Sequence, residues 1–246
     1  GSWLALWLSQ MGAEILGYAL EPNTTPNHFS MLDMSIESVI GDIRDGKNLS
    51  DVFKKFQPEI VFHLAAQPLV LQSYNDPVET FQINVMGTVN LFEACRQTSS
   101  VKAVINITSD KCYENKEWVW GYREKDVIGG YDPYSASKGC SELVTSAYRK
   151  SFFNLDEYGR EHNILVASVR AGNVIGGGDW AKYRIITDLM EAVSQGGKLI
   201  IRNPMSTRPW QHVLSPLSGY LLLGQKLLEG KKEFAEAWNF GSRDDG

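Results

Sequence analysis

Short apolar runs typical of buried strands alternate with amphipathic helical segments along most of the chain. Strands are expected at residues 14–20, 39–42, 59–64, 102–108 and 164–170, and helices at residues 3–11, 48–57, 76–98 and 133–150. Apolar strands that alternate with helices are typical of a parallel sheet covered on both faces. The alternation therefore predicts a doubly wound, Rossmann-type α/β fold with a mostly parallel sheet.

The pattern becomes looser after residue 170. A Gly-rich loop is followed by helices expected at residues 183–194 and 214–228, by a strand expected at 199–202 between them, and by a strand-like end at 239–246. We therefore expect a dinucleotide-binding domain over residues 1–170. Residues 171–246 are expected to form a smaller, mainly substrate-binding lobe that is incomplete at its C-terminal end.

No strand precedes the helix expected at residues 3–11. In a doubly wound sheet the first strand lies at the topological switch point, and the turn after it holds the pyrophosphate of the dinucleotide. Without that strand, unpaired edges would face each other in the middle of the sheet. We therefore expect the natural polypeptide to begin earlier, with Gly1 as the last glycine of a cofactor-binding turn. The alternative is that Gly1-Ser2 is the remnant of a tag.

Composition excludes several classes of protein. The chain has 24 Lys and Arg against 29 Asp and Glu, a net charge of −5, which argues against a basic nucleic-acid-binding face. It lacks an apolar run of about 18 residues that could span a membrane, and its N-terminus does not resemble a signal peptide. The three cysteines and four histidines are scattered without metal-site spacing. These features predict reduced thiols, a cytoplasmic location and no metal centre.

Tyr134 and Lys138 form a Y-x-x-x-K pair near the start of an expected helix, and this spacing places both side chains on one helical face. An unperturbed tyrosine, with a pKa of about 10, is a poor base at neutral pH. A nearby ammonium, or the positive ring of an oxidised nicotinamide, would favour the phenolate. The spacing alone arises by chance, but a strand ending in Thr108-Ser109-Asp110-Lys111 precedes the pair. This context predicts a catalytic cluster.

Four ordered motifs together resemble the extended short-chain dehydrogenases/reductases that act on nucleotide sugars. They are the two segments above, Gly41-Asp42-Ile43-Arg44-Asp45, His63-Leu64-Ala65-Ala66-Gln67, and Val169-Arg170-Ala171-Gly172-Asn173-Val174-Ile175-Gly176. The resemblance spans essentially the whole chain. It implies NAD as the cofactor and a homodimer, or a dimer of dimers, formed through the helices at 76–98 and 133–150.

The resemblance also assigns cofactor contacts. It implies that Asp42 and Ile43 contact the adenine and that Leu64, Ala65 and Ala66 lie beside the cofactor, which Gly1, Tyr134 and Lys138 also contact. The strand at 14–20 ends in Leu20-Glu21-Pro22, without the usual acidic residue at its tip for the adenosine ribose. Glu21 is the substitute candidate, and the choice of NAD over NADP stays open.

Within the family, the acidic Asp110 directly after Ser109 resembles the nucleotide-sugar 4,6-dehydratases. Lys111 stands where many of these enzymes carry glutamate, and this departure, with residues 176–180 and 208–212, is similar to the members that act on CDP-glucose. The resemblance therefore implies a lyase that removes water from a CDP-linked sugar. The alternatives are dTDP-glucose as substrate, a nucleotide-sugar 4-epimerase, and a scaffold that binds NAD without catalysis.

The resemblance implies a role for each catalytic candidate. Tyr134, as phenolate, takes the proton of the sugar 4-hydroxyl during oxidation at C4, while Lys138 holds the phenolate and the nicotinamide ribose. Ser109 binds near the 4-oxygen, and protonated Asp110 gives a proton to the departing 6-hydroxyl. Lys111 is the candidate base for the proton on C5. Its alternative roles are to orient Asp110 or to stabilise the enolate.

Negatively charged substrate phosphates require donors, and the family pattern points to Asn173, Arg184 and Arg208. Each has a plainer alternative, which is a turn residue for Asn173, a solvated helix charge for Arg184 and a surface cation for Arg208. Trp118 and Trp120 are expected to pack or to form a lid.

Overall fold

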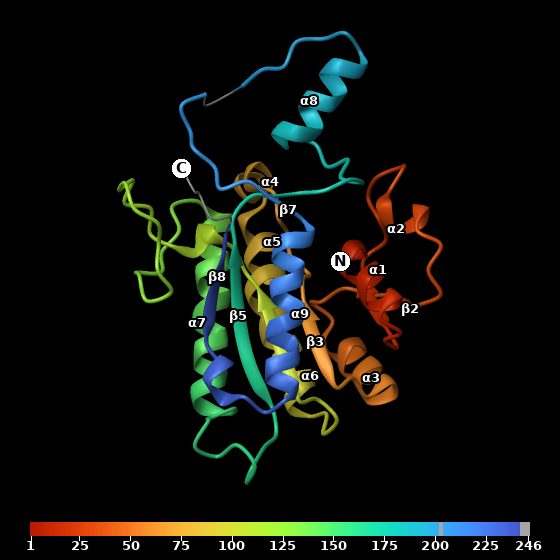
Figure 1. Cartoon of the computed structure of the whole chain (residues 1–246), viewed down its shortest axis with the longest axis vertical. Coiled ribbons are helices and arrows are strands. Elements are labelled where there is room, and N and C mark those ends of the chain that lie inside the picture. Colours follow the sequence, from red (N-terminus) through yellow and green to blue (C-terminus); the bar gives the residue numbers. More distant parts are fainter. Residues whose placement is uncertain (202–203, 242–246) are drawn as a thin grey trace.

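A four-stranded parallel sheet forms the centre of the computed structural model, which describes residues 1–201 and 204–241 (Figure 1). Its strands are β3 (Ile60–His63), β4 (Ala103–Ile107), β5 (Leu165–Ala171) and β8 (Ala237–Phe240), paired in that order. Helices lie on both sides of the sheet. The predicted doubly wound α/β fold is confirmed.

A second parallel sheet contains β1 (Leu16–Ala19) and β2 (Glu37–Ile40), and a third contains β6 (Val174–Ile175) and β7 (Gln211–His212). Within the described ranges, no strand pairs with both β1 and β3. Among the described residues, the β1–β2 sheet is therefore not paired with the central sheet.

One face of the central sheet is covered by α3 (Gly46–Phe56), α6 (Gly87–Arg96) and α7 (Pro133–Ser151). Their apolar side chains form a core with Val104 and Val166 from the strands; its largest fully buried members include Leu49, Phe92 and Phe153. Between β3 and α6 the chain forms α4 (Val70–Asn75), α5 (Pro77–Phe81) and a π-helical turn at Gln82–Met86, η1. The single helix predicted at 76–98 is thus a helical run with a wider turn in its middle.

The opposite face is covered by α1 (Ser2–Gln10) and α9 (Leu214–Leu228). Leu4 and Leu217 pack there against Ile105 and Leu165, and these residues form a second core. Neighbouring residues of β4 alternate between the two faces, because Val104 belongs to the first core and Ile105 to the second. None of the described helices is long and apolar enough to cross a membrane.

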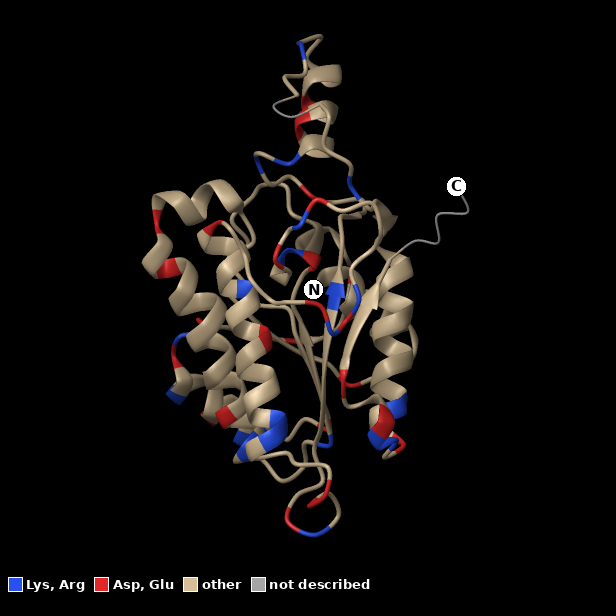
Figure 2. Cartoon of the chain, turned by 90° about the vertical axis from the view of Figure 1, so that its left-hand side faces the viewer, with Lys and Arg blue, Asp and Glu red and all other residues tan. Residues whose placement is uncertain are grey.

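The remaining described elements are short or peripheral. They are α2 (His28–Met31), the 3₁₀ turns η2 (Asp110–Cys112) and η3 (Lys232–Phe234), and α8 (Ile185–Ser194), which lies apart from the sheet at the top of Figure 1. On the side of the described chain seen in Figure 2, Lys and Arg are interspersed with Asp and Glu and form no continuous basic surface.

The prediction of a strand at residues 199–202 is wrong for residues 199–201, which form no strand. Residue 202 lies outside the described residues. Ile200 is 83% exposed, so this apolar run is a surface segment without a pairing partner. The predicted strand-like end is observed up to Phe240, and residues 242–246 lie outside the described residues. The domain boundary at residue 170 stays a prediction; α9 and β8, which follow it, pack on or extend the central sheet.

Candidate active site

Helix α7 begins with a strong N-terminal cap. The Asp132 side chain accepts hydrogen bonds from the Ser135 backbone nitrogen at 2.9 Å and from its hydroxyl at 2.6 Å, and Pro133 occupies the first turn. This cap fixes where the helix starts. It therefore places Tyr134 in the first turn and Lys138 one turn later on the same face.

The end of β4 leads directly to the next group of candidates. Ser109 caps η2, since its hydroxyl accepts a hydrogen bond from the Lys111 backbone nitrogen at 3.2 Å, and it also lies 3.0 Å from an Asp110 carboxylate oxygen. The Ser109 hydroxyl lies close enough to the Tyr134 side chain to act on its ionisation. Asp110 is half-buried and Lys111 is exposed. The structure thus brings together Ser109, Asp110 and Tyr134.

Several groups act on the ionisation of Tyr134. Burial raises its pKa above the ordinary value, and the carboxylates of Asp110 and Asp132 add to this effect. The Ser109 hydroxyl and the positive charge of Arg184 act in the opposite direction and lower the pKa of Tyr134. Formation of the phenolate therefore depends on positive charge brought close to the ring.

Lys138 is a buried ammonium group with more hydrogen-bond donors than its contacts among the described residues use. It is 6% exposed, and its Nζ atom lies 3.4 Å from the carbonyl oxygen of Ile107, the one hydrogen-bond acceptor found for it among the described residues. Burial lowers the pKa of Lys138 to about 8, although Glu142 and Cys112 act to raise it. An ammonium with three donors and one long contact is suited to bind the hydroxyl groups of a ribose. The residues at this position therefore fit a nicotinamide cofactor.

Asp42 and Ile43, which are predicted to contact the adenine, already contact other residues of the protein. Both carboxylate oxygens of Asp42 pair with the Arg44 guanidinium, with a shortest distance of 2.6 Å. The Ile43 side chain is buried beneath α6, where a Cβ atom on Gly87 would lie 2.7 Å from it. Ile43 can therefore offer a ligand only its main chain.

The other predicted cofactor residues lie along the carboxyl edge of the sheet and at the start of α1. Leu64 packs against the second core and Ala65 against the first, whereas Ala66 is half-buried. Gly1 is exposed and is the N-cap residue of α1. The Leu64 and Ala65 side chains anchor the loop, so a ligand would meet mainly its backbone.

The Gly-rich loop after β6 contacts the beginning of α1. The Trp3 indole donates to the Gly177 carbonyl at 2.9 Å, and the Trp3 ring stacks on His28 with centroids 4.7 Å apart. Gly178 has a φ of +83°, and a Cβ atom there would lie 2.4 Å from the His28 ring. Glycine is therefore required at this position. His28 was not a sequence candidate, because a lone histidine in an irregular segment gives no signal.

The three predicted phosphate ligands occupy different surroundings. Arg184 forms an ion pair with Asp179 at 2.9 Å, and both side chains are 40% exposed. Arg208 is exposed and donates to the carbonyl of Thr207. Asn173 is half-buried, and its carbonyl accepts a hydrogen bond from the Gln211 backbone at 2.9 Å. Of the three, only Arg184 acts electrostatically on Tyr134 among the described contacts.

Arg170, which belongs to the same motif as Asn173, is buried rather than open to a substrate. Its guanidinium lies 2.7 Å from the carboxylate of Glu142, and the two side chains are 5% and 3% exposed. Sequence reasoning did not identify this pair, because the partners are 28 residues apart and occur in different elements. No group of residues able to hold a metal ion occurs in the described part of the chain.

The fold and this cluster define a dinucleotide-dependent enzyme of the short-chain dehydrogenase/reductase type. Residues 1–226 match the family model described as GDP-mannose 4,6 dehydratase. The chain therefore belongs to this family of nucleotide-sugar dehydratases within the extended short-chain dehydrogenases/reductases.

Among curated proteins, the chain is similar to the CDP-glucose 4,6-dehydratase of Salmonella typhimurium, with 58% identity over 100% of the chain and 68% of that protein. Among solved structures it resembles the epimerase Mth375 of Methanothermobacter thermautotrophicus, with a TM-score of 0.85, 25% identity, and coverage of 98% of this chain and 68% of that one. It also resembles MoeE5 in complex with UDP-glucose and NAD, with a TM-score of 0.76 and 26% identity. The match covers 98% of this chain and 72% of that one.

Proposed function

We propose that the protein is an NAD-dependent hydro-lyase that converts CDP-glucose to CDP-4-keto-6-deoxyglucose. The observation that carries this proposal is the placement of Asp110 beside Ser109, which in turn lies close enough to Tyr134 to act on its ionisation. An oxidation site of the Ser-Tyr-Lys type thus has an acidic group next to it that can protonate a leaving hydroxyl. The 58% identity to the Salmonella dehydratase supports the choice of substrate.

NAD would be held by Lys138 and Tyr134 at the nicotinamide end, by Leu64, Ala65 and Ala66 along the sheet edge, by Asp42 and Ile43 at the adenine, and by the turn at Gly1. When bound, it accepts hydride from C4 of the sugar and returns hydride to C6. The free donors of the buried Lys138 ammonium support this assignment, as does the NAD in the MoeE5 complex.

Side chains of the protein accept and donate the protons of the reaction. Tyr134, as phenolate, accepts the proton of the sugar 4-hydroxyl, and Ser109 hydrogen-bonds to the 4-oxygen. The resulting 4-ketone acidifies the hydrogen on C5, and Lys111 is the proposed base that removes that proton. Asp110 acts as the general acid that gives a proton to the 6-hydroxyl, which leaves as water. C5 is reprotonated when C6 is reduced, so the net change is the loss of one water.

Asn173, Arg184 and Arg208 are the proposed ligands of the substrate diphosphate. A forked arginine contact suits phosphate oxygens, and Arg184 already lies close enough to influence Tyr134. The exposed ion pair between Arg184 and Asp179 is weak enough for a phosphate to compete for the guanidinium.

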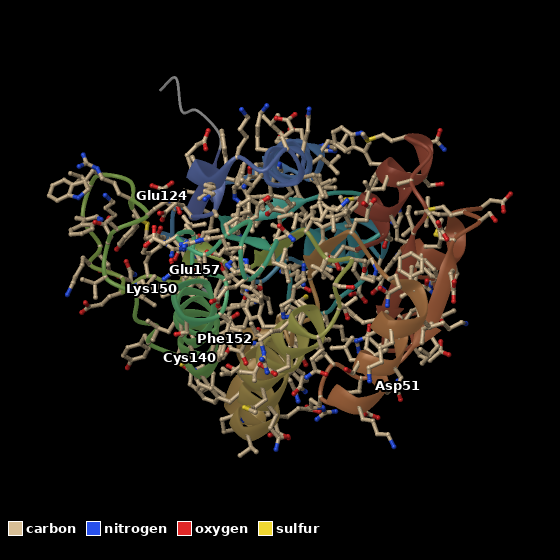
Figure 3. The ribbon with its side chains drawn as sticks, turned by 90° about the horizontal axis from the view of Figure 1, so that it is seen from below. Asp51, Glu124, Cys140, Lys150, Phe152 and Glu157 are labelled. Atoms are coloured by element: carbon tan, nitrogen blue, oxygen red, sulfur yellow. The ribbon has the colours of Figure 1, made fainter. Side chains whose placement is uncertain are left out.

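The protein is also proposed to be a homodimer in the cytoplasm, where its product would enter deoxysugar biosynthesis for the lipopolysaccharide O-antigen. A shallow apolar groove of about 460 Å³ runs between α5, η1 and α7, lined by Val78, Phe81, Val85, Met86 and Cys140 among others. Figure 3 shows Cys140 on α7 near the border with the neighbouring helices. An apolar surface on these helices supports their proposed role as the subunit interface.

Product mass distinguishes the proposals. The full-length protein is incubated with NAD and CDP-glucose and, in a parallel reaction, with dTDP-glucose. We expect CDP-glucose to lose one water without net formation of NADH. Loss of water from dTDP-glucose alone would favour the first alternative, whereas an unchanged mass with inversion at C4 would identify a 4-epimerase. Cofactor binding with neither reaction would indicate a scaffold.

A further inference from the structure

One face of α7 is attached to the last residues of β4 by polar contacts at successive helical turns. Thr145 and Ser141 lie 2.7 and 3.0 Å from the Asn106 side-chain nitrogen, and Lys138 lies 3.4 Å from the Ile107 carbonyl. At the positions that follow β4, Glu142 accepts a hydrogen bond from Thr108, and Ser109 lies close enough to Tyr134 to act on its ionisation. The strand end that carries Ser109 and Asp110 is thus held against the helix that carries Tyr134 and Lys138.

Glu142 is the anionic residue among these contacts between α7 and the end of β4, and it is 3% exposed. One carboxylate oxygen accepts from Thr108, while the other accepts from the Ser168 hydroxyl at 2.8 Å and from Arg170 at 2.7 Å. Hydrogen bonds from three partners, one of them the cationic Arg170, compensate for burial of the carboxylate, and the pKa of Glu142 lies below its usual value. Glu142 is therefore ionised at neutral pH.

The contacts of Glu142 extend beyond β4. Arg170 also donates to the Tyr113 hydroxyl at 2.7 Å and to the Glu124 carbonyl at 2.9 Å. The Tyr113 hydroxyl in turn lies 2.7 Å from the side-chain oxygen of Asn239 on β8. The loop between η2 and α7, on which Figure 3 labels Glu124, is therefore connected through Arg170 to the catalytic helix.

Few titratable groups of the described residues face Lys138. Glu142 approaches from α7, Cys112 from η2 and His63 from β3. Burial lowers the pKa of His63 to about 3, so this ring is neutral, and burial raises the pKa of Cys112 to about 12, so its thiol is protonated. Glu142, which itself faces Arg170 on β5 and Arg149 on α7, is thus the ionised neighbour of Lys138 at neutral pH.

We infer that Glu142 is a positioning residue, one turn after Lys138 on α7, whose buried carboxylate holds the end of β4 against α7 and faces the Lys138 ammonium. Its role in turnover rests on the proposed function, because the ammonium is needed to stabilise the Tyr134 phenolate. Its effect on the ionisation of Lys138 does not depend on which sugar is the substrate.

Two variants separate this role from a simple structural one. Glu142→Gln keeps the shape of the side chain but leaves Arg170 buried without its counter-charge, which destabilises a protein strongly. The double variant Glu142→Gln with Arg170→Gln removes both charges, and neutral replacement of a buried pair is tolerated far better. Both variants remove the anion next to Lys138. The matched control is Glu236→Gln, because Glu236 is 68% exposed and pairs with the buried Arg149 at 3.7 Å.

The test is an NMR titration of the lysine ¹³Cε signals in the full-length protein, with the Lys138 signal assigned by its absence in Lys138→Met. We expect the Lys138 midpoint to fall by about one pH unit in Glu142→Gln, because an opposite charge nearby shifts a pKa by roughly this amount. It should fall by a smaller amount in the double variant, which also removes the positive charge of Arg170. Glu236→Gln should leave the midpoint unchanged. If the wild-type protein turns over CDP-glucose, the alkaline limb of kcat should move with the midpoint.

A double variant that folds with the wild-type Lys138 midpoint would overturn the inference. The titration requires no turnover, so a wild-type protein that fails to dehydrate CDP-glucose would contradict the proposed function while leaving the result on Lys138 valid. A wild-type Lys138 midpoint in the double variant, together with dehydration of CDP-glucose by the wild-type protein, would contradict the inference and leave the proposed function standing.

Discussion

The Nζ atom of Lys138 lies 3.4 Å from the carbonyl oxygen of Ile107, the last residue of β4. Lys138 follows Tyr134 by one turn of α7, and Ile107 precedes Ser109 by two residues. A single contact between helix and strand therefore contributes to the relative placement of the groups proposed to oxidise C4 and of Asp110, proposed to protonate the leaving hydroxyl.

Replacement of Tyr134 by phenylalanine tests the proposed base. Tyr134→Phe retains the ring but cannot accept the proton of the 4-hydroxyl, so kcat for dehydration should fall by roughly 10²–10⁴-fold. The change is measured as the rate of water loss from CDP-glucose. Tyr131→Phe is the control, since Tyr131 is 99% exposed and lies three residues away in the sequence. Equal rates for the two variants would exclude Tyr134 as the base.

The pKa of Lys138 predicts how kcat changes with pH on the alkaline side. Its value of about 8 means that the ammonium is present below this pH and is lost as the pH rises through it. Because the ammonium stabilises the phenolate, kcat should decline above about pH 8. Lys138→Arg retains a positive charge at these pH values and should remove the decline, even with a lower maximum rate. A decline at the same pH in that variant would assign it to another group.

Buried His63 predicts a loss of stability in acid. Its pKa is about 3 in the folded protein, against 6.5 for a free histidine, so the unfolded chain binds a proton that the native protein does not. The free energy of unfolding should therefore fall by an amount on the order of 2 kcal/mol as the pH decreases from 6.5 to 4.5. Urea unfolding of His63→Gln should show a smaller dependence on pH, whereas His212→Gln, at an exposed site, should behave as wild type.

Lys111 is tested by isotope exchange at C5. In deuterated solvent the wild-type protein should incorporate deuterium at C5, and Lys111→Met should incorporate it at least 10²-fold more slowly, because general-base catalysis contributes about this much or more. Product is analysed by mass spectrometry and proton NMR. Lys125→Met, also at an exposed lysine, serves as the control. Exchange at the wild-type rate in Lys111→Met would leave only the orienting or enolate-stabilising role for this residue.

The proposed dimer surface is tested by adding a charge to it. Met86 is 51% exposed and lines the apolar groove between α5 and α7. Met86→Lys should shift the molar mass in light scattering towards the monomer, because a charge buried in an apolar interface is unfavourable. Met31→Lys, at a methionine of α2 that is 64% exposed, should not change the mass. A dimer that persists in Met86→Lys would place the interface elsewhere.

Much of the fold follows from local signals in the sequence. The helix predicted at 214–228 is observed with those bounds, and Asp132-Pro133 marks the beginning of α7 because a cap and a first-turn proline act within a few residues. The failure at residues 199–201 has the opposite cause. Apolar residues there match a strand pattern, but a strand also requires a pairing partner, which a local pattern does not supply.

The candidate site divides in the same way. The Y-x-x-x-K spacing and the Ser109-Asp110 pair at the end of the preceding strand could be recognised locally, and the structure places Ser109 near enough to Tyr134 to act on its ionisation. Glu142 could not be recognised, since its meaning depends on Arg170 in another strand and on Thr108 at the end of β4. The π-helical turn at Gln82–Met86 was missed because its apolar spacing resembles that of an ordinary helix.

Transfer of the C4 hydrogen is the most direct test of the central claim. The full-length protein is given NAD and CDP-glucose deuterated at C4, and the product is analysed by mass spectrometry and NMR. Dehydration by the proposed route predicts a product that has lost one water and carries the deuterium at C6. A sugar of unchanged mass with deuterium still at C4, or a dehydrated product without deuterium at C6, would contradict it.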